Sequence, residues 1–230
     1  MCDHPGTVLC TRCLRLLPYL DPWRACPRCG AAFGRVQCTE CNPVMMAAGG
    51  LSELPFASCT SALMFDASTA RIPRAYKDHG VKALAPIMAQ LMDDALMPEW
   101  KESCQALTFV PATKAAVRRR GFDHTQELAQ ELSARCGLPI APLLARPRST
   151  DQRGLSRSER FANMRRVFQE QGRGSGRGPA GKMQEDSFAP LQEVLLMDDV
   201  MTTGATLFAA ASALRAQGVE RVRCVTFLRV

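Results

Sequence analysis

The alternation of apolar and polar positions along the chain predicts an α/β domain. Four short apolar runs have the length and composition of buried strands, at residues 61–65, 106–110, 194–197 and 222–228. Segments with apolar residues at helical spacing separate these runs, at residues 70–77, 81–97, 125–136 and 207–217. Strands that alternate with helices form a parallel sheet flanked by helices, and we expect a right-handed crossover between the last two strands.

Local signals refine the expected helices and turns. Pro86 predicts either a kink in the 81–97 helix or its true start, because proline disrupts a helix interior but fits the first turn. Residues 77–80 predict a solvated polar turn between helices; the alternative is a turn that faces a ligand. We expect His79 and His124 to be exposed surface histidines.

The segment 193–207, EVLLMDDVMTTGATL, carries the most specific chemistry in the sequence. Its apolar run predicts a strand that ends where Asp198 and Asp199 begin, followed by a threonine-rich turn and a helix. Free backbone N–H groups at the start of that helix, three threonine hydroxyls and a glycine would form a cradle for a phosphate. Carboxylates beside such a cradle suit ribose hydroxyls or Mg²⁺, so the segment predicts a sugar-phosphate site. The alternative is a plain strand–helix unit whose acidic residues only cap the helix.

This segment resembles the phosphoribosyl pyrophosphate (PRPP) loop of the type I phosphoribosyltransferases. The likeness rests on the apolar strand, the Asp-Asp-Val sequence and the Thr-Thr-Gly-x-Thr turn. In that family, the resemblance implies, the acidic pair holds the ribose hydroxyls and Mg²⁺, and the turn wraps the 5′-phosphate. The implied PRPP-binding residues are Asp198, Asp199, Val200, Thr202, Thr203, Gly204, Ala205 and Thr206, with Asp198 and Asp199 as the catalytic pair.

A basic segment follows the 106–110 strand. Pro111 ends that strand, and residues 111–124 then predict a loop with four cationic groups, Lys114, Arg118, Arg119 and Arg120. Ligands of open α/β sheets bind at the carboxyl ends of the strands, so this loop is placed to meet residues 198–206 and to hold the pyrophosphate of PRPP. The alternative is an exposed basic loop with no ligand.

Six of the eleven cysteines form three CxxC pairs within the first 41 residues. Each pair can give two thiolates to one tetrahedral ion, so residues 1–43 predict a small zinc ribbon that is stabilised by structural Zn²⁺. The pairing stays open. One ion could be bound by Cys10, Cys13, Cys26 and Cys29; alternatively, Cys2 and His4 join Cys10 and Cys13 at a first site, and Cys26, Cys29, Cys38 and Cys41 form a second. Redox-active or incidental thiols are the other interpretation.

Composition and charge narrow the class of protein. The chain has 230 residues and 47% hydrophobic content, enough for a core, and no apolar run of about 18 residues that would span a membrane. The N-terminus lacks the design of a signal peptide, so we expect a cytoplasmic protein. The net charge of +7 suits a polyanion, either a pyrophosphate or a nucleic acid. Thirteen positive charges gather in the middle of the chain, at Arg118, Arg119, Arg120, Arg146, Arg148, Arg153, Arg157, Arg160, Arg165, Arg166, Arg173, Arg177 and Lys182.

Further motifs resemble the ComF family over almost the whole chain. They are Arg-Gly-Phe at 120–122, Thr150-x-Gln152-x-x-Leu155, Arg160-x-x-Asn163, Phe168 and the cysteine pairs. Relatives have Asn-Gln after Arg-Gly-Phe where this chain has Asp123-His124. The resemblance implies a phosphoribosyltransferase-like domain at residues 49–230 behind the zinc ribbon, and a role in handling incoming single-stranded DNA during transformation.

Two classes of function remain open. In the first, an enzyme transfers the phosphoribosyl group of PRPP to an unidentified acceptor by displacing pyrophosphate through an oxocarbenium-like state, as a pentosyl glycosyltransferase does. Residues 150–168 would then close over the site as a lid. In the second, the same fold is a non-catalytic module that binds single-stranded DNA or DNA-uptake proteins. The glycine-rich residues 171–187 predict a disordered insert. The acceptor, turnover and oligomeric state are not determined by the sequence.

Overall fold

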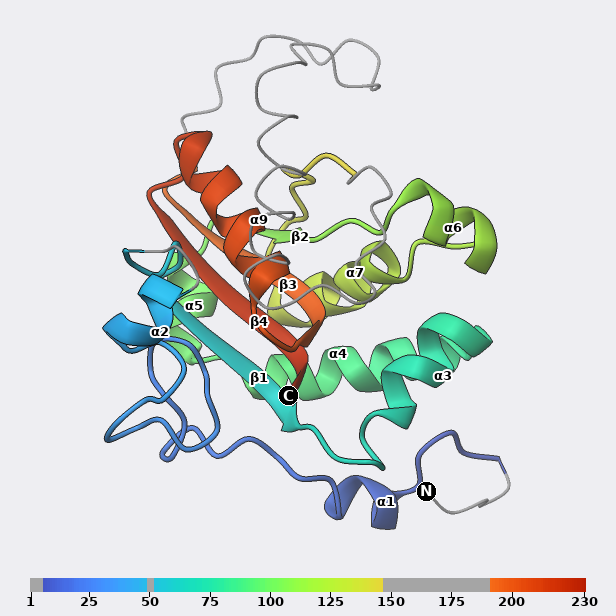
Figure 1. The fold of residues 1–230 in the computed structure, drawn as a ribbon. Coiled ribbons are helices and arrows are strands. Elements are labelled where there is room, and N and C mark those ends of the chain that lie inside the picture. The colour runs from blue at the N-terminus through green and yellow to red at the C-terminus, as the bar shows by residue number, and fades with distance from the viewer. Residues whose placement is uncertain (1–5, 49–51, 147–190) are drawn as a thin grey trace, which may run out of the picture.

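The computed structural model describes residues 6–48, 52–146 and 191–230 (Figure 1). The predicted lid at 150–168, the predicted insert at 171–187, and Cys2 and His4 lie outside the described residues. In chain order the described elements are α1 (Thr11–Arg15), α2 (Pro43–Ala48), β1 (Ser58–Met64), α3 (Arg71–His79), η1 (Lys82–Leu84), α4 (Ala85–Asp94), α5 (Pro98–Ser103), β2 (Ala106–Phe109), α6 (Lys114–Arg120), α7 (His124–Cys136), β3 (Glu193–Met201), α9 (Ala205–Ala216) and β4 (Arg221–Arg229).

These strands form a parallel sheet in the order β1-β4-β3-β2. Short backbone bridges extend both edges of the sheet. Tyr19 pairs antiparallel with Leu63 on β1, and Ile140 pairs parallel with Leu107 on β2. The parallel sheet flanked by helices confirms the predicted fold class.

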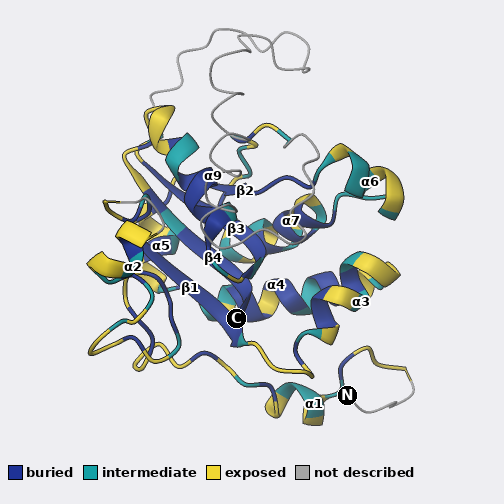
Figure 2. Cartoon of the chain, in the orientation of Figure 1, coloured by how far each residue is buried: buried dark blue, intermediate teal, exposed yellow. Residues whose placement is uncertain are grey.

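Both faces of the sheet are covered, as the buried strands in Figure 2 show. On one face, α4 and α7 form a core with Leu195 and Met197 of β3. On the other face, α9 and the cysteine-containing N-terminal segment form a second core with Val194 and Leu196. Consecutive strand residues point to opposite faces, so burial on both sides accounts for the uninterrupted apolar run of β3.

The predicted end of the central strand is wrong. β3 continues past Asp198 and Asp199 to Met201, because β4 keeps pairing with it as far as Arg229. The acidic pair is therefore part of the sheet and not of the turn that follows. Both carboxyl groups are therefore buried, whereas in a loop they would be exposed to solvent.

The basic segment after β2 is also not a loop, because its residues 114–120 form helix α6. The hydroxyl of Thr113 caps this helix by accepting a hydrogen bond from the N–H of Ala116 at 3.1 Å. Alanine and arginine are strong helix formers, so the cap and the helix propensity of residues 114–120 together favour a helix over the predicted loop. Pro86 lies in the first turn of α4, which confirms the second of its two predicted roles. Among the described residues, no helix has the length and apolar character needed to cross a membrane.

Candidate functional site

The acidic pair lies at the carboxyl end of β3, and Asp198 and Asp199 are each only 7% exposed. Lys77 of α3 donates a hydrogen bond to Asp199, with 2.7 Å between Nζ and Oδ2. His124, the first residue of α7, places its Nε2 atom 3.8 Å from the same oxygen. In the described part of the chain, the Asp198 carboxyl accepts one hydrogen bond, from the N–H of Asp199 to Oδ1 at 2.8 Å. Within the described residues, one carboxyl group is thus paired with a cation and its neighbour is not.

These surroundings shift the pKa values of the two carboxyl groups in opposite directions. Burial, and then the charge of Asp199, raise the pKa of Asp198 to about 8. Burial also opposes the ionisation of Asp199, but the charge and hydrogen bond of Lys77, together with His124 and Arg120, outweigh it and hold the pKa of Asp199 below its usual value. Burial lowers the pKa of His124, so the imidazole is mainly neutral at pH 7. Near neutral pH the acidic pair therefore carries one negative charge.

Lys77 and His124 were both expected on the surface, and both expectations are wrong. Lys77 belongs to the last turns of α3 and reaches the acidic pair. His124 is 7% exposed, its carbonyl accepts a hydrogen bond from Tyr76 at 2.7 Å, and its Nδ1 lies 3.2 Å from Nη1 of Arg120. Packing of α3 and α7 against the end of β3 buries these side chains. No local pattern in the sequence predicts the contacts of Lys77 and His124 with Asp199.

An open hollow of about 590 Å³ adjoins the acidic pair through Lys77 and contains further basic groups. Arg120 is anchored there by Asp78, with 2.9 Å between Nη2 and Oδ1. The residues that line the hollow are Lys77, Asp78, His79, Gly80, Arg119 and Arg120. Two of the four predicted pyrophosphate residues, Arg119 and Arg120, thus gather here; Lys114 and Arg118, on the same helix, are not among the lining residues. The basic side chains of the hollow suit an anionic group.

The threonine-rich turn joins the end of β3 to the start of α9. Gly204 adopts a left-handed conformation with φ of +79°. A Cβ atom at this position would lie 2.5 Å from Cε2 of Phe208, so both the backbone and the packing require glycine. The hydroxyl of Thr203 lies near the N–H of Ala205 at 3.4 Å, and the helix of 12 residues begins there. The turn therefore brings hydroxyls and helix N-terminal amides to the strand end that holds the acidic pair.

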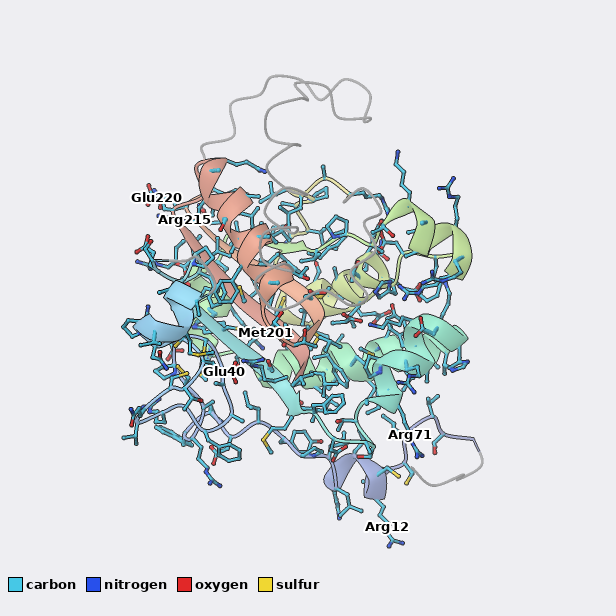
Figure 3. The ribbon with its side chains drawn as sticks, viewed as in Figure 1. Arg12, Glu40, Arg71, Met201, Arg215 and Glu220 are labelled. Atoms are coloured by element: carbon cyan, nitrogen blue, oxygen red, sulfur yellow. The ribbon has the colours of Figure 1, made fainter. Side chains whose placement is uncertain are left out.

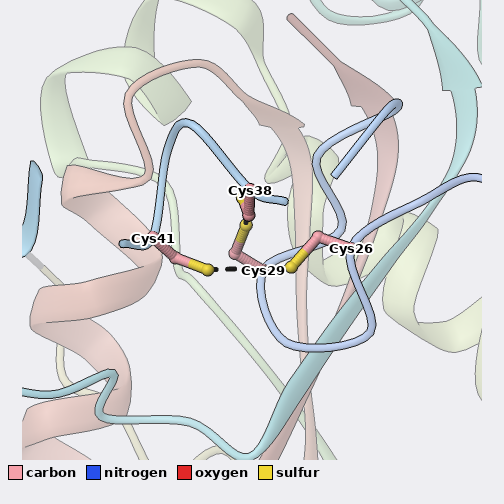
Figure 4. A group of neighbouring side chains, drawn as sticks. All are labelled: Cys26, Cys29, Cys38 and Cys41. Carbon is pink, nitrogen blue, oxygen red and sulfur yellow. Dashed lines mark hydrogen bonds between the residues drawn. The ribbon is translucent and has the colours of Figure 1, made fainter. Parts of the chain in front are cut away.

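Four cysteines meet on the face of the sheet opposite α4 and α7 (Figure 4). Their sulfur atoms all lie within 4.8 Å of one another, and two of the Sγ–Sγ separations are 3.5 and 3.6 Å. A tetrahedral zinc ion with Zn–S bonds of about 2.3 Å requires sulfurs about 3.8 Å apart, so these thiols fit zinc without an open coordination position. The four residues are Cys26, Cys29, Cys38 and Cys41. Burial raises the pKa of Cys41 to about 12, so metal binding must displace protons from the thiols.

The four-cysteine cluster decides between the predicted pairings. Cys26 and Cys29 combine with the third CxxC pair, so the arrangement in which they share an ion with Cys10 and Cys13 is not the one found. Cys10 and Cys13 lie at α1, outside the cluster, and their role as ligands stays a prediction. The cluster also rests directly on the sheet. A Cβ atom on Gly30 would lie 2.8 Å from the carbonyl oxygen of Cys59 in β1, so only glycine permits this approach.

The fold and the order of these groups define a class of protein. The phosphoribosyl transferase domain family matches residues 115–230, half of the chain, and the chain belongs to this family. It is also similar to Competence protein F of Haemophilus influenzae, with 29% identity over 144 residues. That match covers 62% of this chain and 58% of the relative, so it spans less than two thirds of the relative's length. The two matches confirm the family resemblance that the sequence motifs indicated.

Proposed function

We propose that the chain binds PRPP at the carboxyl end of its sheet. The observation that carries this proposal is the order of three groups along one sheet edge: the buried acidic pair, the threonine-glycine turn and the basic hollow. Asp198 and Asp199 would hold the ribose hydroxyls, residues 202–206 the 5′-phosphate, and Lys114 to Arg120 the pyrophosphate. Membership of the phosphoribosyl transferase domain family supports a substrate of the PRPP type.

The donor set of the acidic pair fits Mg²⁺, which prefers carboxylate oxygens together with substrate phosphates. Bound there with PRPP, Mg²⁺ would neutralise charge on the pyrophosphate. The chain's own contribution is positional. Lys77 keeps Asp199 ionised, and Arg120, fixed by Asp78, presents a guanidinium to the hollow. Both ends of PRPP would thus be held while the bond between C1 and the pyrophosphate is exposed to an acceptor.

We further propose transfer of the phosphoribosyl group to an acceptor in the course of DNA uptake. The acceptor would attack C1 of the ribose, pyrophosphate would leave, and positive charge would develop on the ring. With the ribose held by the acidic pair, the single negative charge of that pair near pH 7 would stabilise the developing positive charge. The similarity to Competence protein F supports the link to competence. A cytoplasmic site of action would keep the four zinc-binding cysteines reduced.

The proposal is tested by isothermal titration of the zinc-loaded protein with PRPP and Mg²⁺. We expect binding by the wild type and its loss in the double variant Asp198→Asn, Asp199→Asn. Asp94→Asn, an exposed aspartate at the end of α4, is the matched control and should bind as the wild type does. No binding by the wild type would refute the proposal. Equal binding by the double variant would place PRPP elsewhere.

A second candidate function, the binding of single-stranded DNA, is favoured by aromatic groups on the cysteine-rich segment. Trp23 and Phe33 are 79% and 68% exposed. The guanidinium of Arg24 lies 5.0 Å from the centre of the Phe33 ring, and Arg28 and Arg35 are also exposed. Exposed aromatic rings among arginines are the groups on which single-stranded bases stack.

Fluorescence anisotropy with a labelled oligonucleotide tests this candidate. Affinity should fall steeply with salt, because phosphate contacts release counterions. The variant Trp23→Ala, Phe33→Ala should bind at least about tenfold more weakly, given about 1–3 kcal/mol for each stacked base. An unchanged affinity in that variant would exclude the cysteine-rich segment as the binding surface.

A further inference from the structure

Arg229, the last residue of β4, is buried and holds the start of the phosphate turn. Its side chain is 3% exposed. Its Nη1 atom donates to the carbonyl oxygens of Met201 at 3.2 Å and Thr202 at 2.8 Å. A third bond goes to the carbonyl of Val230 at 3.0 Å. Within the described residues, most hydrogen bonds of this buried guanidinium therefore go to backbone carbonyls, two of them where β3 passes into the turn.

These bonds have a consequence for the amides of the turn. The peptide unit is planar and trans, so its C=O and N–H point in opposite directions. When Arg229 holds the carbonyls of Met201 and Thr202, the N–H groups of Thr202 and Thr203 are directed away from the guanidinium. Both of these amides belong to the predicted phosphate cradle. The carbonyl of Met201 also accepts the N–H of Val230 at 3.0 Å, so the sheet helps to hold the first peptide. Arg229 therefore holds the Thr202–Thr203 peptide and reinforces the one before it, without contacting the ligand.

The counter-charge for Arg229 comes from the four-cysteine cluster. Nη2 of Arg229 donates to Oε2 of Glu40, which lies between Cys38 and Cys41. The N–H of Glu40 points to Sγ of Cys38 at 3.4 Å, so the same residue touches a predicted zinc ligand. Figure 3 places Glu40 and Met201 at the same end of the sheet. One residue of the CxxC turn thus bridges the cluster and the guanidinium.

Glu40 matters because a buried guanidinium is costly without a partner of opposite charge. Among the described residues, the Nε atom of Arg229 is buried without a hydrogen-bond partner. The guanidinium otherwise bonds only to the neutral carbonyls of Met201, Thr202 and Val230 in this part of the chain. Loss of the Glu40 charge would favour movement of Arg229 toward water. The carbonyl of Thr202 would then lose this donor, whereas the carbonyl of Met201 would keep its bond from the N–H of Val230 at 3.0 Å.

We infer that Arg229 is a positioning residue for the phosphate turn and that the four-cysteine cluster controls it through Glu40. This inference rests on the proposed PRPP site and deepens it. Zinc that orders residues 38–41 would fix Glu40, Glu40 would fix Arg229, and Arg229 would fix the amides of Thr202 and Thr203. Zinc binding and phosphate binding are then coupled, and by linkage each ligand strengthens the other by the same factor.

The first test measures the turn without any ligand. Hydrogen exchange of the peptide 199–208 is compared between the zinc-loaded wild type, Glu40→Gln and Glu220→Gln. Glu220 is exposed and lies at the other end of the sheet, so it is the matched control (Figure 3). We expect at least about threefold faster exchange of this peptide in Glu40→Gln alone, with unchanged zinc content. Equal exchange in all three proteins would overturn the inference, as would a rise spread evenly over the whole chain.

The second test measures coupling to PRPP. Glu40→Gln should bind PRPP with Mg²⁺ about three- to tenfold more weakly than the wild type, and Glu40→Asp, which keeps the charge, should recover part of the loss. Removal of zinc by a chelator should weaken binding by the wild type but have less effect on Glu40→Gln, because its link is already broken. Equal affinities of wild type and Glu40→Gln would refute the coupling alone. If the wild type does not bind PRPP, the proposed function fails, and the exchange experiment still decides the role of Arg229.

Discussion

Replacement of either member of the acidic pair by asparagine tests the charge assignment at the site, because the two substitutions should have opposite effects on stability. Asp198 has its pKa raised to about 8 by burial and by Asp199. Asp199 has its pKa lowered, since Lys77, His124 and Arg120 together outweigh the effect of burial. Asparagine resembles a protonated aspartic acid. In Asp198→Asn the side-chain Oδ1 can still accept the hydrogen bond from the N–H of residue 199.

The magnitude for Asp198 follows from proton linkage. An unfolded aspartate has a pKa of about 3.9, so the stabilisation from the bound proton is fully present below that pH and is lost as pH rises through about 8. The slope is at most about 1.4 kcal/mol per pH unit, or roughly 2–3 kcal/mol between pH 6 and 8. Asp198→Asn lacks this ionisation. Its stability relative to the wild type should therefore increase by that amount over the same range.

Asp199→Asn should destabilise the protein at neutral pH. It leaves the ammonium of Lys77 without its partner, and because that side chain is 26% exposed the cost should be about 1–3 kcal/mol, below the range for fully buried pairs. A carboxyl group with a lowered pKa stabilises the fold above its unfolded pKa, and this contribution is lost as pH falls through the folded pKa. The deficit of Asp199→Asn should therefore shrink below about pH 4.

Urea unfolding of both variants from pH 3 to pH 9, followed by tryptophan fluorescence, measures these differences. Asp94→Asn is the control and should follow the wild type at each pH, because Asp94 is exposed at the end of α4. The reasoning is refuted if the difference between Asp198→Asn and the wild type does not change with pH. It is equally refuted if both variants lose the same stability at pH 8, since the carboxyl groups would then be equivalent.

Three further substitutions probe separate parts of the site. Lys77→Met should cost about 1–3 kcal/mol at pH 8 and less at pH 5, where the carboxyl groups can take up a second proton, whereas Lys82→Met, from an exposed ion pair, should cost under about 1 kcal/mol in urea unfolding. Gly204→Ala should lower thermal stability by several degrees and abolish PRPP binding, because its Cβ would lie 2.5 Å from Phe208; retained binding would contradict the required turn geometry. Cys38→Ser should lose the zinc of the four-cysteine cluster in a metal assay, and undiminished zinc at that cluster would show that its ligands are different.

Much of the fold was predictable because its signals are local. The apolar run before Asp198 requires a strand buried on both faces, and the glycine of the Thr-Thr-Gly turn is the residue that a left-handed start to α9 needs. Each CxxC pair likewise specifies a turn that presents two thiolates. These patterns depend on residues within a few positions of one another. They could be read without knowing how the elements pack.

Other features depended on residues that are distant in the chain. Lys77 reaches Asp199 across 122 positions, and Arg229 reaches Glu40 across 189 positions. Neither pair has a sequence signature, because charged residues outside a motif are ordinarily solvated. The burial of His124 has the same origin, since a histidine at the start of a helix is exposed unless another element covers it.

The sequence by itself therefore determined the parallel strands, the phosphate turn and the cysteine pairs, since backbone geometry and metal chemistry restrict those residues locally. The tertiary structure alone decided which cysteine pairs share a site, which carboxyl group meets a cation and where the guanidinium of Arg229 finds its counter-charge. The physical reason is that these charges and thiols acquire their properties from burial and from partners within a few ångströms. Only the packing of α3, α7 and the cysteine-rich segment on the sheet supplies them.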